Sequence, residues 1–290
     1  MKWLLIALPM FCMCGLLMAG HSPRFGRLPL YLPATGAAAA APADPNVDKT
    51  AYLLYFNKTN STEPVATNSA PIGIGFDVNL ATANEPARID SSATGTNDHM
   101  DFDNVNDYIV NRDLTGISGT EGTFNLHIKL GTSGDRGRVI QMENEAGGSP
   151  DSGFFTEQRT DNRVGILLAV DGVTQWQVQT VSAILGATIG SWHMWTVRHN
   201  GAAVQFYLDG VPQALSFTVS TDTNAWMDAM LAGTIPPDYV AHGAALFGGV
   251  LVPMDAALYR ASYYTQSLSS AEILALTNTS PVDGIEVLLE

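Results

Sequence analysis

Cysteine is almost absent from this 290-residue chain. Its two cysteines, Cys12 and Cys14, lie in an apolar run near the N-terminus, and the rest of the chain contains none. A disulfide within the body of the chain and a zinc site made of thiolates are therefore excluded. A chain of this length can bury enough apolar surface to fold without disulfides, so the scarcity of cysteine does not exclude export.

Charged residues are also scarce, and positive charge is the scarcer sign. They make up 14% of the chain, with 28 Asp and Glu against 14 Lys and Arg, for a formal net charge of −14 at pH 7. Such a surface repels a phosphate backbone, which argues against nucleic acid as a partner. The 46% hydrophobic content suffices for a core, and one large all-β domain fits the length.

Residues 1–20 form an apolar leader. Lys2 precedes an uncharged run from Trp3 to Gly20, the arrangement of a secretory signal peptide. The cleavage site is poor, because Leu17 stands where a small residue is expected if Ala19 ends the leader. At roughly 18 residues, or about 27 Å as a helix, the run also fits an uncleaved membrane anchor. An apolar arm buried in an assembly is the third alternative.

Residues 21–47 have little periodicity and are typical of a linker. The string from Leu32 to Gly36 matches a sortase signal, but it lies near the wrong terminus, so we interpret it as chance. The folded domain is expected to span residues 48–290.

From Phe124 onward, the chain divides into short alternating runs separated by turn signals, which is typical of an all-β sandwich. In each turn, a glycine supplies the positive φ that a tight hairpin needs, after an Asn or Asp that tolerates it. The pattern predicts a series of antiparallel hairpins. The turns are Asp171-Gly172, Asn200-Gly201 and Asp209-Gly210.

Alternation assigns faces in two of these strands. Trp195 and Val197 share parity, so both are expected to face the core. In the strand 204–208, apolar residues alternate with Gln205 and Tyr207, which predicts burial on one face only.

A short helix is predicted after Ser269. The Ser269 hydroxyl and the Glu272 carboxylate are spaced to form a capping box. Ile273, Leu274 and Leu276 then provide an apolar face. A helix this short needs packing to persist, and we expect it to lie across an open end or edge of the sandwich.

A Trp192-His193 strand, an Asn-Gly turn, a strand ending in Tyr-x-Asp-Gly and a Leu-Ser-x-x-Glu-Ile helix start follow one another in this chain. Their order and spacing resemble those of the laminin G-like members of the concanavalin A-like superfamily. The resemblance implies a two-sheet antiparallel jelly-roll sandwich with one short C-terminal helix. It also implies structural roles for Trp192, Trp195, Asp209, Gly210, Ser269 and Glu272.

Aromatic residues are candidates for an exposed surface that binds a sugar or a protein, because rings give a large contact area at low entropic cost. Core packing is the alternative. The candidates are Trp176, Trp226, Tyr239, Tyr263 and Tyr264.

Acidic and amide residues gather in the segment 97–107, where oxygen-rich loops suit Ca²⁺. The superfamily often carries calcium at a sandwich edge. An Asx-rich turn region without metal is the alternative. The possible ligands are Asp98, Asp101, Asp103 and Asp107.

Glycoside hydrolases of related folds need two carboxylates flanking the sugar bond. Glu143 and Glu145 are the nearest candidates, but a Gly-rich loop signal follows them, so we interpret them as solvated charges at a strand end. No catalytic residue is assigned.

The sequence thus favours a non-catalytic module for recognition or adhesion, secreted or at a cell surface, that binds a glycan or protein ligand. A structural or decorating protein of a virion or other extracellular assembly, in contact with its own copies, is the alternative. A glycoside hydrolase is third. No cofactor other than calcium is expected, and membrane contact is expected only through the leader.

Overall fold

The computed structural model describes residues 50–55, 67–68, 87–89, 99–105, 108–112, 114, 116–131, 136–144, 151–243 and 253–277. All belong to one unit of the chain, Ala40–Glu290. The predicted leader, the predicted linker and the predicted domain start at residue 48 lie outside the described residues. No helix within the described ranges is both long and apolar enough to cross a membrane.

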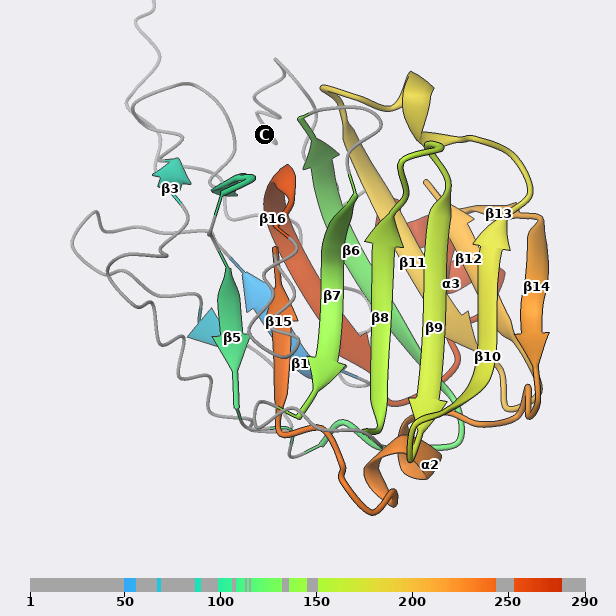
Figure 1. The fold of residues 1–290 in the computed structure, drawn as a ribbon. Coiled ribbons are helices and arrows are strands. Elements are labelled where there is room, and N and C mark those ends of the chain that lie inside the picture. The colour runs from blue at the N-terminus through green and yellow to red at the C-terminus, as the bar shows by residue number, and fades with distance from the viewer. Residues whose placement is uncertain are drawn as a thin grey trace, which may run out of the picture. The chain divides into compact units, whose positions relative to one another are not determined.

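The described strands form two antiparallel sheets (Figure 1). The nine-stranded sheet contains β1 (Thr50–Tyr55), β2 (Thr67–Asn68), β3 (Ala87–Ile89), β4 (His99–Asp103), β6 (Gly122–Leu130), β11 (Trp192–His199), β12 (Val204–Leu208), β13 (Val211–Gln213) and β16 (Asp255–Tyr264). Its order is β13-β12-β11-β6-β16-β1-β2, with β4 paired to β16 and β3 to β4.

The seven-stranded sheet contains β5 (Ile109–Asn111), β7 (Gly137–Glu143), β8 (Gly153–Gln158), β9 (Val164–Val170), β10 (Val173–Thr180), β14 (Leu215–Ser220) and β15 (Tyr239–His242). Its order is β14-β10-β9-β8-β7-β15-β5. Figure 1 shows these strands in front of those of the other sheet. The chain crosses between the sheets at Ala214, the one residue between β13 and β14.

The hydrophobic core lies between the two sheets. Phe124 of β6 and Phe154 of β8 stack with their ring centroids 5.1 Å apart. Trp195 and Val197 are both buried in this core, so the predicted inward face of β11 is confirmed. Alternate residues of facing strands supply one continuous core, and the predicted two-sheet β-sandwich is confirmed.

The two Asp-Gly turns are tight hairpins, as predicted. Asp171 and Gly172 have φ angles of 47° and 73°, and Asp209 and Gly210 have φ angles of 50° and 75°. Positive φ at both central residues defines the type I′ turn, whose twist matches that of the strands it joins.

The Asn200-Gly201 turn is wider than its sequence suggests. Residues 200–203 form a four-residue loop between β11 and β12, in which Gly201 has a φ of 83°. The Asn200 side-chain oxygen accepts hydrogen bonds from the backbone N–H groups of Ala202 and Ala203, at 3.1 and 3.0 Å. Asn200 therefore shapes this loop through its side chain.

The C-terminal helix α3 (Ser270–Thr277) begins at the predicted capping box. The Ser269 backbone N–H donates to Glu272 Oε2 at 2.7 Å, and the Glu272 N–H donates to Ser269 Oγ at 3.3 Å. Two further short helices were not predicted: α2 (Met227–Leu231) and the 3₁₀ turn η2 (Leu185–Ala187).

The position predicted for α3 is wrong. The helix covers the outer face of the nine-stranded sheet, the face turned away from the core, rather than an open end or edge. Ile273 and Leu276 are buried there in a second cluster with Tyr207. Tyr207 is only 3% exposed, so the prediction that its strand is buried on one face only is also wrong. Leu274, expected on the apolar face, is 56% exposed.

Candidate ligand-binding site

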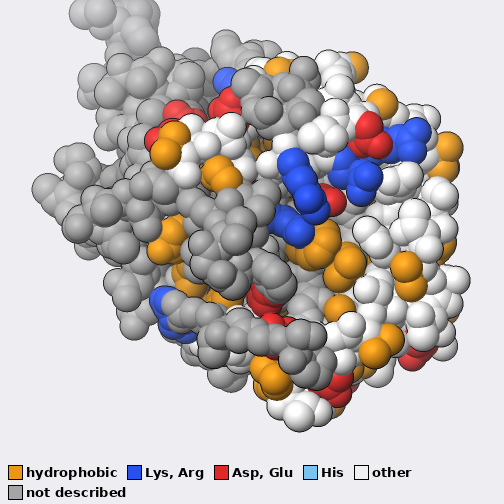
Figure 2. All heavy atoms as spheres, in the orientation of Figure 1, with side chains coloured by type: hydrophobic (Ala, Val, Ile, Leu, Met, Phe, Trp, Pro, Cys, Tyr) orange, Lys and Arg blue, Asp and Glu red, His pale blue; other side chains and the backbone are white. Residues whose placement is uncertain are grey.

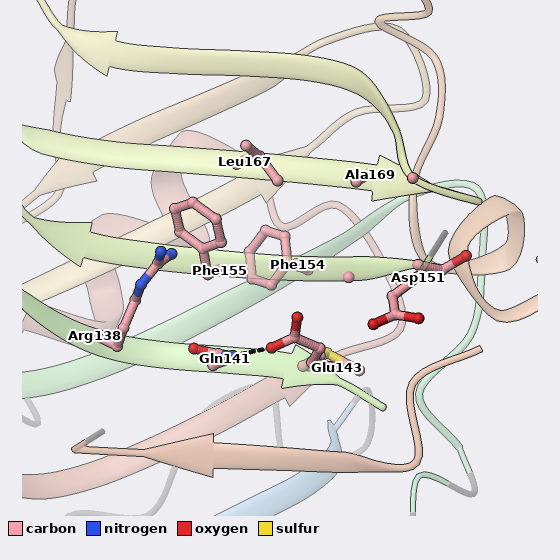
Figure 3. A pocket seen from close by; sticks show the side chains of 12 residues that line it. Arg138, Gln141, Glu143, Asp151, Phe154, Phe155, Leu167 and Ala169 are labelled. Carbon is pink, nitrogen blue, oxygen red and sulfur yellow. Dashed lines mark hydrogen bonds between the residues drawn. The ribbon is translucent and has the colours of Figure 1, made fainter. Parts of the chain in front are cut away.

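A pocket of about 310 Å³ lies on the outer face of the seven-stranded sheet, formed by β7, β8 and β9 (Figure 3). Successive residues of a strand point to opposite faces. Because Met142, Phe154 and Leu168 point into the core, their neighbours point outward and line the pocket. The outward side chains are Gln141, Glu143, Phe155, Leu167 and Ala169.

One part of the pocket is apolar and aromatic. Phe155, Leu167 and Ala169 lie side by side on β8 and β9. The guanidinium carbon of Arg138 lies 3.2 Å from the centroid of the Phe155 ring, a cation–π contact. A flat apolar surface of this kind suits the face of a sugar ring or another ring.

The other part of the pocket is acidic. Glu143 ends β7, and Figure 3 shows its carboxylate on the same side of the pocket as that of Asp151. The Gln141 side-chain amide donates a hydrogen bond to Glu143 Oε2. Amide and carboxylate groups of this kind bind hydroxyl groups, because both offer strong acceptors.

Burial raises the pKa of Glu143 to about 7, and the negative charge of Asp151 adds to the increase. The hydrogen bond from Gln141 and the charge of Arg138 act in the opposite direction. The Glu143 carboxyl is therefore partly protonated at neutral pH, and its protonated form both donates and accepts hydrogen bonds. Interpreting Glu143 as a solvated strand-end charge is wrong, since the residue is only 8% exposed. Glu145 lies outside the described residues.

Hydrogen bonds to neighbouring loops hold the segment Asp151-Ser152, at the acidic part of the pocket, in place. The Gly172 N–H donates to the Asp151 carbonyl at 2.8 Å, and the Asp171 N–H donates to Ser152 Oγ at 3.0 Å. Asp171 Oδ1 in turn accepts from the Thr234 N–H at 2.6 Å. The tight β9–β10 turn thus holds the segment that carries the Asp151 side chain.

The five aromatic residues predicted to form an exposed surface are all buried. Each is at most 1% exposed, so the expected exposed aromatic surface is wrong and core packing describes all of them. The Trp176 and Trp226 rings are nearly parallel, with centroids 6.1 Å apart, and Tyr264 lies beneath α3. The residues are Trp176, Trp226, Tyr239, Tyr263 and Tyr264.

Two of the four possible calcium ligands can be placed. Asp101 and Asp103 on β4 line a hollow of about 480 Å³ with Lys129 and Asp255. Asp103 Oδ1 also accepts from the Val105 N–H at 2.9 Å, as in an Asx turn. Asp98 and Asp107 lie outside the described residues, and the described ones contain no group of three acidic, His or Cys side chains suited to a metal ion. Calcium stays a prediction.

The fold and the pocket define the class of protein, a two-sheet antiparallel β-sandwich with a candidate ligand site on one outer face. No family model matches the chain. No curated protein matches it in sequence either.

Among solved structures, the fold is similar to the receptor-binding domains of botulinum neurotoxins. The binding domain of serotype D matches 80% of this chain with a TM-score of 0.55 and 11% identity, and 51% of that chain is covered. The type G receptor-binding domain matches 79% of this chain with a TM-score of 0.53 and 9% identity, again covering 51% of that chain.

A serotype D ligand-binding domain in complex with N-acetylneuraminic acid has a TM-score of 0.53 and 10% identity over 80% of this chain. This chain spans about half the length of these structures. At such low identity, the similarity shows the fold alone.

Proposed function

We propose that this protein is a non-catalytic recognition module of the laminin G-like kind that binds a glycan in the pocket on the outer face of the seven-stranded sheet. The observation that carries the proposal is the pairing of the Phe155 ring with the Glu143 carboxyl and the Gln141 amide in one pocket. A sugar has an apolar face that stacks on a ring, and hydroxyl groups that bind planar polar side chains. The N-acetylneuraminic acid complex of a similar fold gives further support.

A glycan array followed by calorimetry tests this proposal. We expect the wild-type protein to bind at least one glycan and Phe155→Ala to weaken that binding at least about tenfold, because the ring supplies the stacking surface. Phe217→Ala is the matched control, since Phe217 is 41% exposed on β14, does not line the pocket, and should leave affinity unchanged. The absence of glycan binding by the wild-type protein would overturn the proposal.

A second candidate function is glycoside hydrolysis, favoured by two carboxyl groups in one pocket with different environments. Glu143 has its pKa raised to about 7, the property of a general acid, and Asp151 lies beside it. Incubation of the protein with bound oligosaccharides and mass spectrometry of the products separates the two functions. Turnover that Glu143→Gln abolishes without loss of binding would replace the first proposal with the second.

The proposed module acts outside the cell or at its surface, and it contacts a membrane only where residues 1–20 stay attached as an anchor. The apolar leader supports this location. Mass spectrometry of the native N-terminus tests it, with a start near His21 expected. An intact Met1 in purified particles would instead support the arm of an assembly.

A further inference from the structure

Four arginines gather at one end of the pocket, on a protein with a formal net charge of −14. They come from the start of β7, the end of β8 and the start of β9, which neighbour one another in the sheet. Figure 2 shows blue side chains grouped on this face, above hydrophobic side chains. The four, called the arginine cluster below, are Arg136, Arg138, Arg159 and Arg163.

Two carboxylates lie within this arginine cluster and leave it with an excess of positive charge. Glu157 Oε2 lies 3.0 Å from Arg136 Nε and 3.7 Å from Arg138 Nε, and Glu157 Oε1 lies 3.7 Å from Arg159 Nη1. Asp161 lies 3.5 Å from Arg159 and 3.8 Å from Arg163. Glu157 is thus shared among three guanidinium groups and cannot neutralise them all.

Arg138 is the member of the cluster that lines the pocket. Its side chain is 13% exposed, and its Nε and Nη1 atoms have no hydrogen-bond partner in the part of the chain that the structure describes. The 3.7 Å contact with Glu157 is too long for a hydrogen bond. Burial lowers the pKa of Arg138 to about 10, so the group stays charged at neutral pH. Buried donors without an acceptor are unfavourable, and an oxyanion offers the missing acceptors.

We infer that the glycan carries an anionic group, a carboxylate or a sulfate, which Arg138 binds while the sugar ring that carries it lies against Phe155. The inference rests on the proposed function and names the class of ligand. The charges of the pocket also set the orientation, because Asp151, together with Glu143 when it is ionised, repels an anion from the end opposite Arg138 (Figure 3). The sugar hydroxyls therefore lie toward the carboxyl groups and the anionic group toward the arginine cluster.

Calorimetry with three tetrasaccharides tests the inference: a uronic acid oligomer, a sulfated oligomer without carboxylate, and a neutral oligomer. We expect at least one acidic oligomer to bind at least about tenfold more tightly than the neutral one, as hydrogen bonds to charged groups predict. The first two arms separate a carboxylate from a sulfate ligand. The preference should shrink as salt rises from 50 to 500 mM, because Coulomb attraction is screened.

Arg138→Gln should reduce the ratio of acidic to neutral affinity to less than about twofold, because the guanidinium that would bind the anion is gone. Arg163→Gln is the matched control, since Arg163 belongs to the arginine cluster but does not line the pocket, and it should change affinity less than about twofold. Arg138→Lys, which keeps the charge and a contact with the ring, should retain part of the preference if Arg138→Gln fails to fold. Equal binding of neutral and acidic oligomers by the wild-type protein would overturn the inference and leave the proposed function standing. The absence of binding to any glycan, on the array or by calorimetry, would overturn both.

Discussion

His193 and Asp209 face each other across the β11–β12 hairpin, with 2.6 Å between His193 Nδ1 and Asp209 Oδ2. The other carboxylate oxygen, Oδ1, accepts from the Met194 backbone N–H at 2.7 Å. Asp209 is also the first residue of the type I′ turn into β13, with a φ of 50°. The Asp209 side chain thus links the β12–β13 turn to the start of β11.

Asp209→Ala should destabilise the protein by about 1–3 kcal/mol, since it removes both contacts and places alanine at positive φ. Asp209→Asn should cost less, because asparagine keeps one acceptor oxygen and tolerates this backbone region. Urea unfolding of both variants and of His193→Ala checks the order. Equal losses for the alanine and asparagine variants would contradict the predicted contributions of the Met194 hydrogen bond and of the backbone angle.

Trp195→Ala should lower the free energy of unfolding by about 3–5 kcal/mol. The Trp195 ring is buried in the core and meets the Phe206 ring edge to face, with the two ring centroids 5.7 Å apart. Trp192→Ala is the control, since Trp192 lies on the same strand but is only half-buried. The centroid of its ring lies 6.2 Å from that of Tyr259. Its loss should be clearly smaller. Thermal unfolding of the two variants measures the difference, and a larger loss for Trp192 would contradict the assignment of faces.

Ser269→Ala should cost about 0.5–2 kcal/mol by removing the cap of α3. Ser270→Ala, one position inside the helix, should cost less than about 0.5 kcal/mol. Ser270 is an exposed residue, and its hydroxyl makes a 3.3 Å contact with the Tyr207 hydroxyl. Chemical denaturation of both variants is the measurement, and equal costs would speak against the cap.

Glu143→Gln should become more stable relative to wild type as pH rises. The pKa of Glu143 is raised from 4.5 to about 7, so between these pH values the folded protein holds a proton that the unfolded chain has lost. Wild-type stability therefore falls across this window, whereas glutamine does not titrate. The difference in the free energy of unfolding between the two proteins should change by roughly 1–3 kcal/mol between pH 4 and pH 8, less than the full pKa shift would give, because solvent screens part of the interaction. Urea unfolding of both proteins across this pH range measures the difference in their free energies of unfolding. A difference that does not vary with pH would contradict the burial of the Glu143 carboxyl.

The sequence predicts those parts of the fold that depend on a few neighbouring residues. Asp171-Gly172 specifies its hairpin because positive φ is a property of the turn residues themselves. The capping box is equally local, since Ser269 and Glu272 are three residues apart. The place of α3 on the sheet is not local, and the alternation around Tyr207 gives no sign that a helix 60 or so residues later covers it.

The candidate site was harder to predict because it depends on how the outward faces of three consecutive strands, β7, β8 and β9, are brought together. The adjacent Phe154 and Phe155 do predict an outward-facing ring, because one of two successive residues in a strand must face outward. The raised pKa of Glu143, by contrast, depends on its burial beside Gln141 and Asp151, which the sequence around Glu143 does not reveal. The arginine cluster could not be predicted from the sequence either, because the β7–β8 hairpin separates Arg136 and Arg138 from Arg159 and Arg163.

The pairing of β6 with β16 sets an order of events during synthesis. These two strands are neighbours at the centre of the nine-stranded sheet, yet Phe124 pairs with Tyr263, near the far end of the described chain. On the ribosome, the hairpins from β7 to β10 can form before β16, the partner of β6, has been synthesised. The nascent protein therefore leaves one hydrogen-bonding edge of β6 unpaired until β16 has been synthesised, and a chaperone that shields this edge would act in that interval.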